Sequence, residues 1–290
     1  MRAAAILGLG CSPRNLEPFK KESNATWALG LPSSARDADA IVLFGGDGTI
    51  HRHLPALVKL ALPVLIVPAG SGNDFARALQ LQKVRDSLRA WKKFENGGDN
   101  TWTIDLGTIK ETDTSGSERL HYFCCVAGCG LDGAVASRAN ALPRWLRAHG
   151  GYLLSIPPAL RSYQPARMKI SSAALHNAMQ LHSDRPTLVV ACANAPAYGD
   201  GMKIAPRALL DDGLLDICSI AAIGNFKLFR LLPTVFFGKH LGIREVDYFQ
   251  SARVQIEPDR PLDVYADGEY VCQTPVEVGI QPSALRVIVP

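Results

Sequence analysis

Residues 40–49 read Ala-Ile-Val-Leu-Phe-Gly-Gly-Asp-Gly-Thr and join an apolar run to a glycine-rich turn. The run is short and continuous, as is typical of a parallel strand that is covered on both faces. The three glycines permit backbone conformations closed to other residues and leave room for a bulky group to approach. Backbone N–H groups at this turn and at the start of the next helix favour an anion such as phosphate, so Asp47 is expected to act through a metal ion or a donor group. Alone, such a run is also typical of a plain tight turn.

A second strand and a second glycine turn follow. Residues 65–68, Leu-Ile-Val-Pro, predict a buried strand, and residues 69–77, Ala-Gly-Ser-Gly-Asn-Asp-Phe-Ala-Arg, predict a glycine turn that runs into a helix. Between the two turns, residues 50–62 place their apolar side chains at a helical spacing. This alternation of strand and helix predicts a parallel sheet with ligands at the carboxyl ends of its strands, where both turns would lie.

Together the two turns resemble the signatures of the diacylglycerol kinase catalytic-domain family of lipid kinases, a GGDGT turn and a P-x-G-T-x-N-D-F-A-R segment. This chain matches the first at residues 45–49 and the second at residues 68–77, with Ser71 where the family usually has threonine. The family is related to sphingosine kinases and more distantly to NAD kinases, which resemble it at the GGDGT turn. The resemblance implies an N-terminal Rossmann-like nucleotide-binding α/β domain and a C-terminal mainly antiparallel β-sandwich domain, with a cleft between them.

Length and composition agree with two globular domains. The 290 residues suffice for two cores, and 47% hydrophobic with 20% charged residues excludes a disordered or an integral membrane chain. Following the family, we expect the nucleotide-binding α/β domain at residues 1–107 and 282–290, where the last strand returns, and a β-rich lipid-substrate domain at residues 108–281. The formal net charge of +4 favours an anionic surface and does not indicate nucleic acid.

The seven cysteines show no paired Cys-x-x-Cys spacing for zinc, and their odd, unpatterned number indicates a reducing compartment. Cys124, Cys125 and Cys129 lie in a segment that we expect to be extended. Because neighbouring residues of a strand point to opposite faces, this pattern argues against a metal ion shared by these thiols. Residues 2–11 have too short an apolar core for a secretory signal, so we expect a first strand there.

Regular structure elsewhere is predicted from apolar spacing and from proline. Residues 74–95 predict one or two helices, and residues 220–241 predict a helix pair over the second sheet. Residues 132–165 are expected to be helical with interruptions at Pro143 and at Pro157 with Pro158. Asp105 matches a family aspartate, although without the resemblance it would be an aspartate at a surface strand end.

The resemblance implies where ATP and magnesium bind. ATP would lie on the two glycine turns, with a magnesium ion near Asp47 and Asp74. Asp47 would then be catalytic through the metal and would contribute little to the core. The nucleotide-binding residues so implied are Gly45, Gly46, Asp47, Gly48, Thr49, Gly70, Ser71, Gly72, Asn73 and Asp74.

Two further sites are implied in the second domain. The general base would be Asp267 or Glu269 of an Asp-Gly-Glu segment. A structural magnesium ion would bind Asp212 together with the backbone oxygens of Leu209 and Leu214, which is a reasonable ligand set for a hard cation. Without the resemblance, both segments would be predicted as hairpin turns.

The chain departs from the family pattern at several positions. His51 and Arg52 stand where asparagine and glutamate are common, and Cys125 replaces an asparagine whose amide can both donate and accept. Residues 11–15 keep only fragments of the first-turn motif, and Asp200 replaces a glycine. A nucleotide-binding protein with a degenerate kinase site therefore stays open as an alternative.

We interpret the chain as an ATP-dependent lipid kinase whose acceptor is a diacylglycerol-like or sphingoid-like lipid. An NAD kinase-like enzyme is a further alternative, against which residues 73–77 argue. We expect a cytoplasmic protein peripheral to the membrane, which meets its lipid substrate at the membrane surface, forms a homodimer and binds no nucleic acid. The basic residues expected to face an anionic bilayer are Arg138, Arg144, Arg147, Lys227, Arg230, Lys239 and Arg244.

Overall fold

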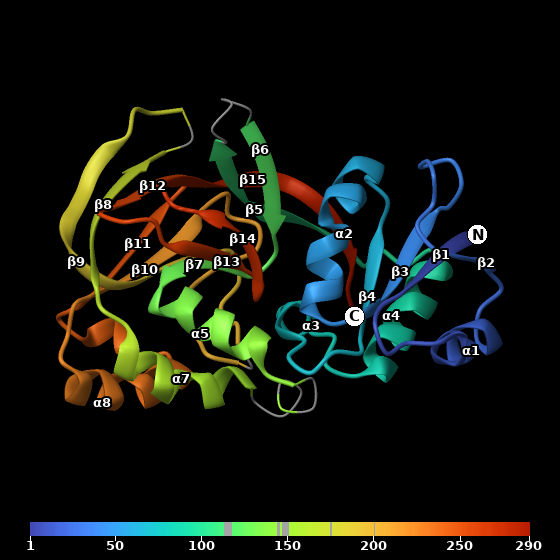
Figure 1. The fold of residues 1–290 in the computed structure, drawn as a ribbon. Coiled ribbons are helices and arrows are strands. Elements are labelled where there is room, and N and C mark those ends of the chain that lie inside the picture. The colour runs from blue at the N-terminus through green and yellow to red at the C-terminus, as the bar shows by residue number, and fades with distance from the viewer. Residues whose placement is uncertain (113–117, 144–145, 147–150, 175, 200) are drawn as a thin grey trace. The chain divides into compact units, whose positions relative to one another are not determined.

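The computed structural model describes residues 1–112, 118–143, 146, 151–174, 176–199 and 201–290 (Figure 1). They form two compact units. The first comprises Met1–Asp105 and Pro282–Pro290, and the second comprises Leu106–Gln281. The first unit alternates helices with parallel strands, and the second is built mainly of antiparallel strands. The predicted fold class, α/β followed by an antiparallel β domain, is confirmed.

The first unit is a parallel sheet with helices between its strands (Figure 1). Its strands run in the order β4, β3, β1, β2, and the end of β15 extends the sheet through a parallel pairing of Val287 with Val64. The strands are β1 (Arg2–Leu7), β2 (Thr26–Leu29), β3 (Ala40–Gly45), β4 (Val64–Pro68) and β15 (Val276–Ile288). The helices are α1 (Pro13–Lys21), α2 (Asp47–Leu60), α3 (Asp74–Ala78) and α4 (Val84–Glu95). Every residue of β3 is buried, as its continuous apolar run predicted.

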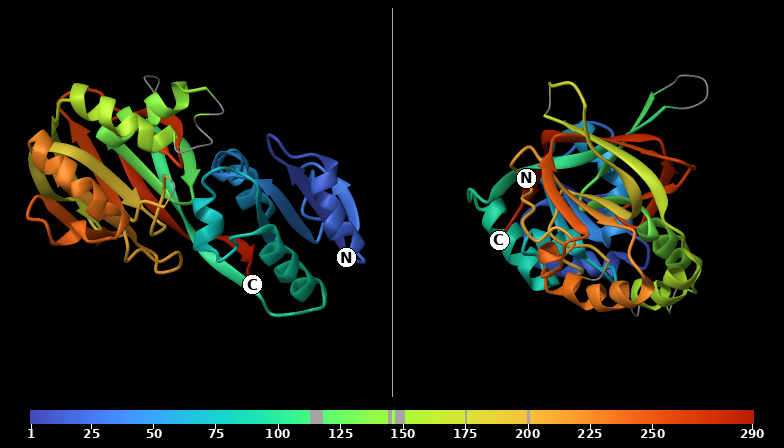
Figure 2. Two further views of the ribbon diagram at one scale, coloured as in Figure 1. Left: turned by 90° about the horizontal axis from the view of Figure 1, so that it is seen from below. Right: turned by 90° about the vertical axis from the view of Figure 1, so that its left-hand side faces the viewer.

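The second unit is a large antiparallel sheet assembly with helices beside it (Figure 2). Pairings run in the order β14, β13, β7, β9, β8, β12, β15, while β10 joins β9 to β11 and β5 joins β15 to β6. The strands are β5 (Thr101–Thr112), which enters from the first unit, β6 (Glu118–Phe123), β7 (Val126–Gly130), β8 (Ala166–Ala173), β9 (Gln180–Ala193), β10 (Leu215–Ala221), β11 (Val246–Ser251), β12 (Arg253–Pro258), β13 (Asp263–Ala266) and β14 (Glu269–Gln273). The helices are α5 (Leu131–Ala141), α7 (Gly151–Ser162), α8 (Asn225–Phe236) and the 3₁₀ turn η1 (His240–Gly242).

Three predictions of regular structure need correction. Helix α7 continues through Pro157 and Pro158. Each proline removes a backbone hydrogen bond, and burial of the neighbouring Ile156 and Ala159 compensates for this loss. Residues 220–241 contain one helix and a 3₁₀ turn, since β10 extends to Ala221. Helix α2 begins at Asp47 and not after the glycine turn. Among the described residues, no helix is long and apolar enough to cross a membrane.

A buried histidine makes the stability of the second unit depend on pH. His240 is fully buried, its Nε2 lies 3.0 Å from the carbonyl oxygen of Ile204, and burial lowers the pKa of its imidazole. As the pH falls, His240 therefore binds a proton more readily in the unfolded chain than in the folded chain. We expect the free energy of unfolding to fall as the pH drops below about 6.5, the ordinary pKa of histidine.

Denaturant titrations at stepped pH check this expectation. His240→Gln keeps an N–H donor near Ile204 without a titrating ring, so it should weaken the loss of stability below that pH. His176→Gln, at an exposed position of the same unit, is the control and should keep the wild-type dependence. An identical pH dependence in His240→Gln would show that another group is responsible.

Candidate functional site

The first glycine turn forms the N-terminus of helix α2. Gly46 is the N-cap residue, so Asp47 and Gly48 belong to the first helical turn. The N–H groups of Thr49 and Ile50 already bond to the carbonyl oxygen of Gly46. The N–H groups that precede them in the first turn have no acceptor within a helix and point out of its end. This end of the 14-residue helix is therefore suited to an anion.

Parallel pairing brings both glycine turns to one edge of the first sheet. Gly45 pairs with Pro68, and the N–H of Ala69 donates to the carbonyl oxygen of Gly45 over 3.1 Å. The carboxyl end of β1 lies at the same edge, because Leu7 pairs with Phe44. Three strand ends therefore meet where the sequence placed only two turns.

Gly46 and Gly70 bring the two turns into direct contact. A Cβ atom at Gly46 would lie 2.8 Å from the Cα of Gly70, and one at Gly70 would lie 2.5 Å from the Cα of Gly46. Asn73 closes the second turn, since its side-chain oxygen accepts the N–H of Gly70 over 2.8 Å and its amide donates to the carbonyl oxygen of Gly70 over 2.7 Å. Asn73 itself has φ = 55°, a conformation that asparagine tolerates better than most residues. Any side chain at either glycine would push the turns apart.

The structure adds Gly8 to this site, which sequence reasoning did not single out. A Cβ atom at Gly8 would lie 2.6 Å from Oγ1 of Thr49, and one at Gly45 would lie 2.6 Å from Cβ of Thr49. Thr49 is only 7% exposed and fills the space between these two glycines. Its side chain therefore packs against the ends of β1 and β3. A glycine within residues 2–11, where the first strand was predicted, was the available signal.

Asp47 ties the two turns together. Its carboxylate accepts the N–H of Asp74 through Oδ2 and the N–H of Phe75 through Oδ1, each over 3.1 Å. The first N–H groups of α3 are thus already bound. Asp74 is buried, and its carboxylate forms an ion pair with Arg77. The carboxylate of Asp47 on α2 therefore also caps α3, a structural role that the sequence pattern did not predict.

This contact changes what an Asp47→Ala variant should do. Removing the carboxylate leaves two N–H groups of α3 without their acceptor, which we expect to cost about 1–2 kcal/mol of stability. Thermal melts of this variant and of Asp99→Ala, an exposed aspartate in the same unit, check the prediction. A melting temperature equal to that of the wild type would show that the cap does not stabilise the unit.

Asp105 lies inside strand β5 and is 3% exposed. Its Oδ1 accepts the N–H of Ser283 over 2.7 Å, which fixes the returning segment 282–290 to the first unit. The alternative of an aspartate at a surface strand end is therefore wrong.

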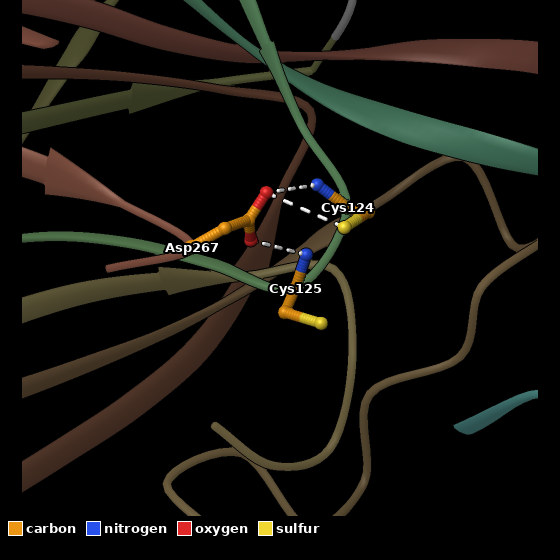
Figure 3. Close-up of side chains that lie close together, drawn as sticks. All are labelled: Cys124, Cys125 and Asp267. Atoms are coloured by element: carbon orange, nitrogen blue, oxygen red, sulfur yellow. Dashed lines mark hydrogen bonds between the residues drawn. The ribbon is translucent and has the colours of Figure 1, made fainter. Parts of the chain in front are cut away.

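In the second unit, Asp267 occupies the turn between β13 and β14. Both Asp267 and Gly268 have positive φ, 51° and 84°, as a tight two-residue hairpin turn requires. The carboxylate of Asp267 accepts backbone N–H groups from Cys124 over 2.9 Å and from Cys125 over 2.8 Å (Figure 3). It also accepts the N–H of Val126 over 3.3 Å. Glu269, the other predicted base, is exposed at the start of β14. The structure thus fixes the position of one carboxylate and leaves the other in solvent.

Cys124 and Cys125 lie in the bend between β6 and β7, so the prediction that they point to opposite faces of a strand is wrong. Asn194 holds this bend: its side-chain amide donates to the carbonyl oxygen of Cys124 over 3.1 Å, and its N–H donates to that of Cys125 over 2.8 Å. None of the seven cysteines forms a disulfide. The sulfur atoms of this pair and a carboxylate oxygen of Asp267 all lie within 4.8 Å of one another.

The predicted magnesium segment is an aspartate turn. Asp212 is exposed, and its Oδ1 accepts the N–H of Leu214 over 3.0 Å. Gln250 links it to a second carboxylate, since its Nε2 lies 3.2 Å from Oδ2 of Asp212 and 3.3 Å from Oδ2 of Asp216. Asp216 is fully buried and accepts the hydroxyl of Tyr248 over 2.6 Å. Sequence reasoning missed Asp216, although an aspartate between apolar residues of a buried strand was a signal.

The donor groups fit the cofactors unequally. The helix end beside the contacting glycines of the first unit suits a phosphate group, because backbone N–H groups at a helix N-terminus favour an anion. Asp47 presents two carboxylate oxygens beside the helix end, and carboxylate oxygens are ligands that a hard cation prefers. Asp212 and Asp216 are oxygen donors of the kind that magnesium prefers. Leu209 is exposed beside this turn.

Comparison with known proteins gives two matching family models. Residues 17–109 match the diacylglycerol kinase catalytic domain, and residues 125–289 match the YegS C-terminal NAD kinase beta sandwich-like domain. Over 256 residues, the chain is 34% identical to a diacylglycerol kinase of Mycobacterium tuberculosis, covering 88% of this chain and 78% of that protein.

Two solved structures share the fold. A Bacillus anthracis protein assigned to the diacylglycerol kinases superposes with a TM-score of 0.74 at 20% identity, covering 100% of this chain and 97% of the other. An NAD kinase from Archaeoglobus fulgidus in complex with ATP gives a TM-score of 0.55 at 12% identity, covering 99% and 93%. At these identities the similarity concerns the fold alone.

Proposed function

Because the chain belongs to the diacylglycerol kinase family of lipid kinases, we propose that it transfers the γ-phosphate of ATP to a hydroxyl of a diacylglycerol-like or sphingoid-like lipid. The observation that carries this proposal is the contact between the Gly46 and Gly70 turns at one sheet edge, within the unit that holds most of the catalytic-domain match. Phosphoryl transfer depends mainly on positioning and charge neutralisation, and these turns offer backbone N–H groups for that task.

The phosphates of ATP would lie on the turns of the first unit. The first helical turn of α2 and the backbone of residues 70–73 would bind them, while the sheet edge provides a rigid support. Magnesium, when bound, would neutralise the charge that develops on the transferred phosphate, and Asp47 is the residue best placed to hold it in this unit. Thr49 would act indirectly, by fixing Gly45 and Gly8.

Asp267 is the proposed base for the lipid hydroxyl. Its three backbone hydrogen bonds hold the carboxylate in one orientation, and such positioning is what general base catalysis requires. Asp212, with the backbone oxygens of Leu209 and Leu214, is proposed as a structural magnesium site of the second unit. In that site Asp216 and Gln250 would orient the ligand carboxylate.

The lipid acceptor would be met at a membrane surface, with the protein cytoplasmic, peripheral to the membrane and dimeric. Helix α8 supports this proposal, because Phe229 is 69% exposed and Phe237, just after the helix, is 72% exposed. Arg230 lies on the same helix, and basic side chains beside exposed aromatic ones suit an anionic bilayer. Arg144 and Arg147, also expected at this surface, lie outside the described residues.

The proposal is tested by ATP turnover with a panel of acceptors. Isotopically labelled ATP would be incubated with vesicles that contain diacylglycerol, with vesicles that contain a sphingoid base, and with NAD. Label in a lipid product supports the proposal, and its identity gives the substrate. Label in NAD alone would establish an NAD kinase-like enzyme instead. ATP binding without any labelled product would establish a nucleotide-binding protein with a degenerate site.

A further inference from the structure

The bend that holds Asp267 also brings two thiols beside its carboxylate. We propose that Cys124, Cys125 and Asp267 form a binding site for a thiophilic divalent cation of the Zn²⁺ type, separate from any magnesium site. One ligand atom from each residue lies within 4.8 Å of the other two (Figure 3). The two segments that contribute them are far apart in the sequence, but backbone hydrogen bonds join them directly.

The chemistry of these donors selects a soft metal. Two thiolates and one carboxylate are common ligands of zinc, and three protein ligands leave a fourth position for water. Magnesium and calcium prefer oxygen donors, so a site with two sulfur atoms discriminates against them. A metal of this class therefore has a place in the chain that ATP-bound magnesium would not occupy.

The distances require only a small adjustment. Sγ of Cys124 lies 3.3 Å from Oδ2 of Asp267. An ion bonded to this sulfur at about 2.3 Å and to this oxygen at about 2.0 Å would have an S–Zn–O angle of about 100°, near the tetrahedral value. The two sulfur atoms of a tetrahedral site lie about 3.8 Å apart, and those of Cys124 and Cys125 lie within 4.8 Å of each other, so a shift of about 1 Å at most brings them to that separation. The backbone of the bend can stay fixed, because Asn194 and Asp267 both hold it.

Access and proton balance follow from burial. Cys124 and Cys125 are 0% and 2% exposed, while Asp267 is partly exposed, so the carboxylate is the member through which an ion enters. Each thiol loses one proton when it binds, so one Zn²⁺ replaces two protons. Binding should therefore strengthen as the pH rises.

Binding of the metal would also engage the proposed base. A carboxylate oxygen that is bonded to zinc cannot accept the proton of a lipid hydroxyl, so an occupied site would inhibit phosphoryl transfer. This consequence rests on the proposed function, whereas binding itself does not.

X-ray absorption on the wild-type protein loaded with one equivalent of Zn²⁺ tests the ligand set without any variant. We expect two sulfur ligands together with oxygen ligands. A first shell of oxygen and nitrogen alone, or failure of the protein to retain zinc on gel filtration in the presence of excess Mg²⁺, would overturn the proposal.

Titration with Cd²⁺, followed through thiolate charge-transfer absorption, locates the site. Cys124→Ser and Cys125→Ser should each weaken binding by about 100-fold, since hydroxyls are poor ligands for this metal. Cys129→Ala, a buried cysteine of the adjoining strand β7, is the matched control and should bind as the wild type does. Equal affinity in all four proteins would place the cation elsewhere and contradict the proposal.

Kinase assays separate this inference from the proposed function. If the wild type phosphorylates lipid, Zn²⁺ should inhibit it at saturating Mg²⁺, and inhibition should require higher Zn²⁺ in Cys125→Ser. If no lipid is phosphorylated, the proposed function fails while the absorption measurements still decide the metal site.

Discussion

Replacing Asp267 by asparagine should lower kcat for lipid phosphorylation by about 10²–10⁴-fold, the usual contribution of a general base. Asparagine has the shape of aspartate, and its carbonyl oxygen can still accept an N–H from the bend at residues 124–126. It cannot accept the proton of the lipid hydroxyl. ATP binding, which we assign to the other unit, should change by less than about threefold, a difference of well under 1 kcal/mol.

Steady-state kinetics and nucleotide titration on the same preparation check this prediction. Asp263→Asn, an exposed position on strand β13, is the control for altering a carboxylate near the turn. Glu269→Gln distinguishes between the two predicted bases. If kcat falls strongly in Glu269→Gln while Asp267→Asn keeps the wild-type kcat, the base is Glu269. Loss of ATP affinity in Asp267→Asn would instead indicate damage to the fold.

Substitution of Gly70 by alanine should damage nucleotide binding and stability together. The added Cβ would lie 2.5 Å from the Cα of Gly46 and 3.1 Å from its nitrogen, and a backbone contact of this kind is relieved only by moving a turn. Overpacking typically costs about 1–3 kcal/mol. If the phosphates bind on these turns, ATP affinity should fall by about tenfold or more, equivalent to about 1.4 kcal/mol.

Thermal melts with and without ATP, together with direct titration, measure both effects. Gly242→Ala is a suitable control, because a Cβ there would meet no atom within 4 Å and its φ is not positive. The same loss in Gly46→Ala is expected, since the contact is mutual. Wild-type affinity in a destabilised Gly70→Ala protein would mean that the nucleotide does not use this pair of turns.

Local sequence patterns predicted the strand, turn and helix of each glycine motif, because a continuous apolar run followed by glycine has few other structures. They also predicted the parallel sheet in which residues 45–49 and 69–73 share an edge. What they could not predict are contacts that depend on the packing of distant residues. The carboxylate of Asp47 on α3, and Thr49 against Gly8, both depend on how neighbouring elements pack.

The second unit shows the same limit in a different form. Residues 124 and 125 lie in a segment whose sequence predicts a strand, yet the chain bends there. Asn194 donates a hydrogen bond to the carbonyl oxygen of Cys124, and the N–H of Cys124 donates to Asp267. The bend reverses the inference drawn from alternating side chains and places both thiols near one carboxylate. A pattern within a segment cannot report a bend that partners far along the chain create.

The return of residues 282–290 to the first unit has a consequence for biosynthesis. Val287 pairs with Val64, the N–H of Val289 donates to the carbonyl oxygen of Asn100 over 2.9 Å, and Ser283 binds Asp105. During translation, the ribosome releases residues 1–105 long before their last strand exists. The first unit must therefore wait, with one edge of β4 unpaired, while the whole second unit is synthesised. Chaperones that shield such an edge have their longest opportunity to act on the part of the chain that is made first.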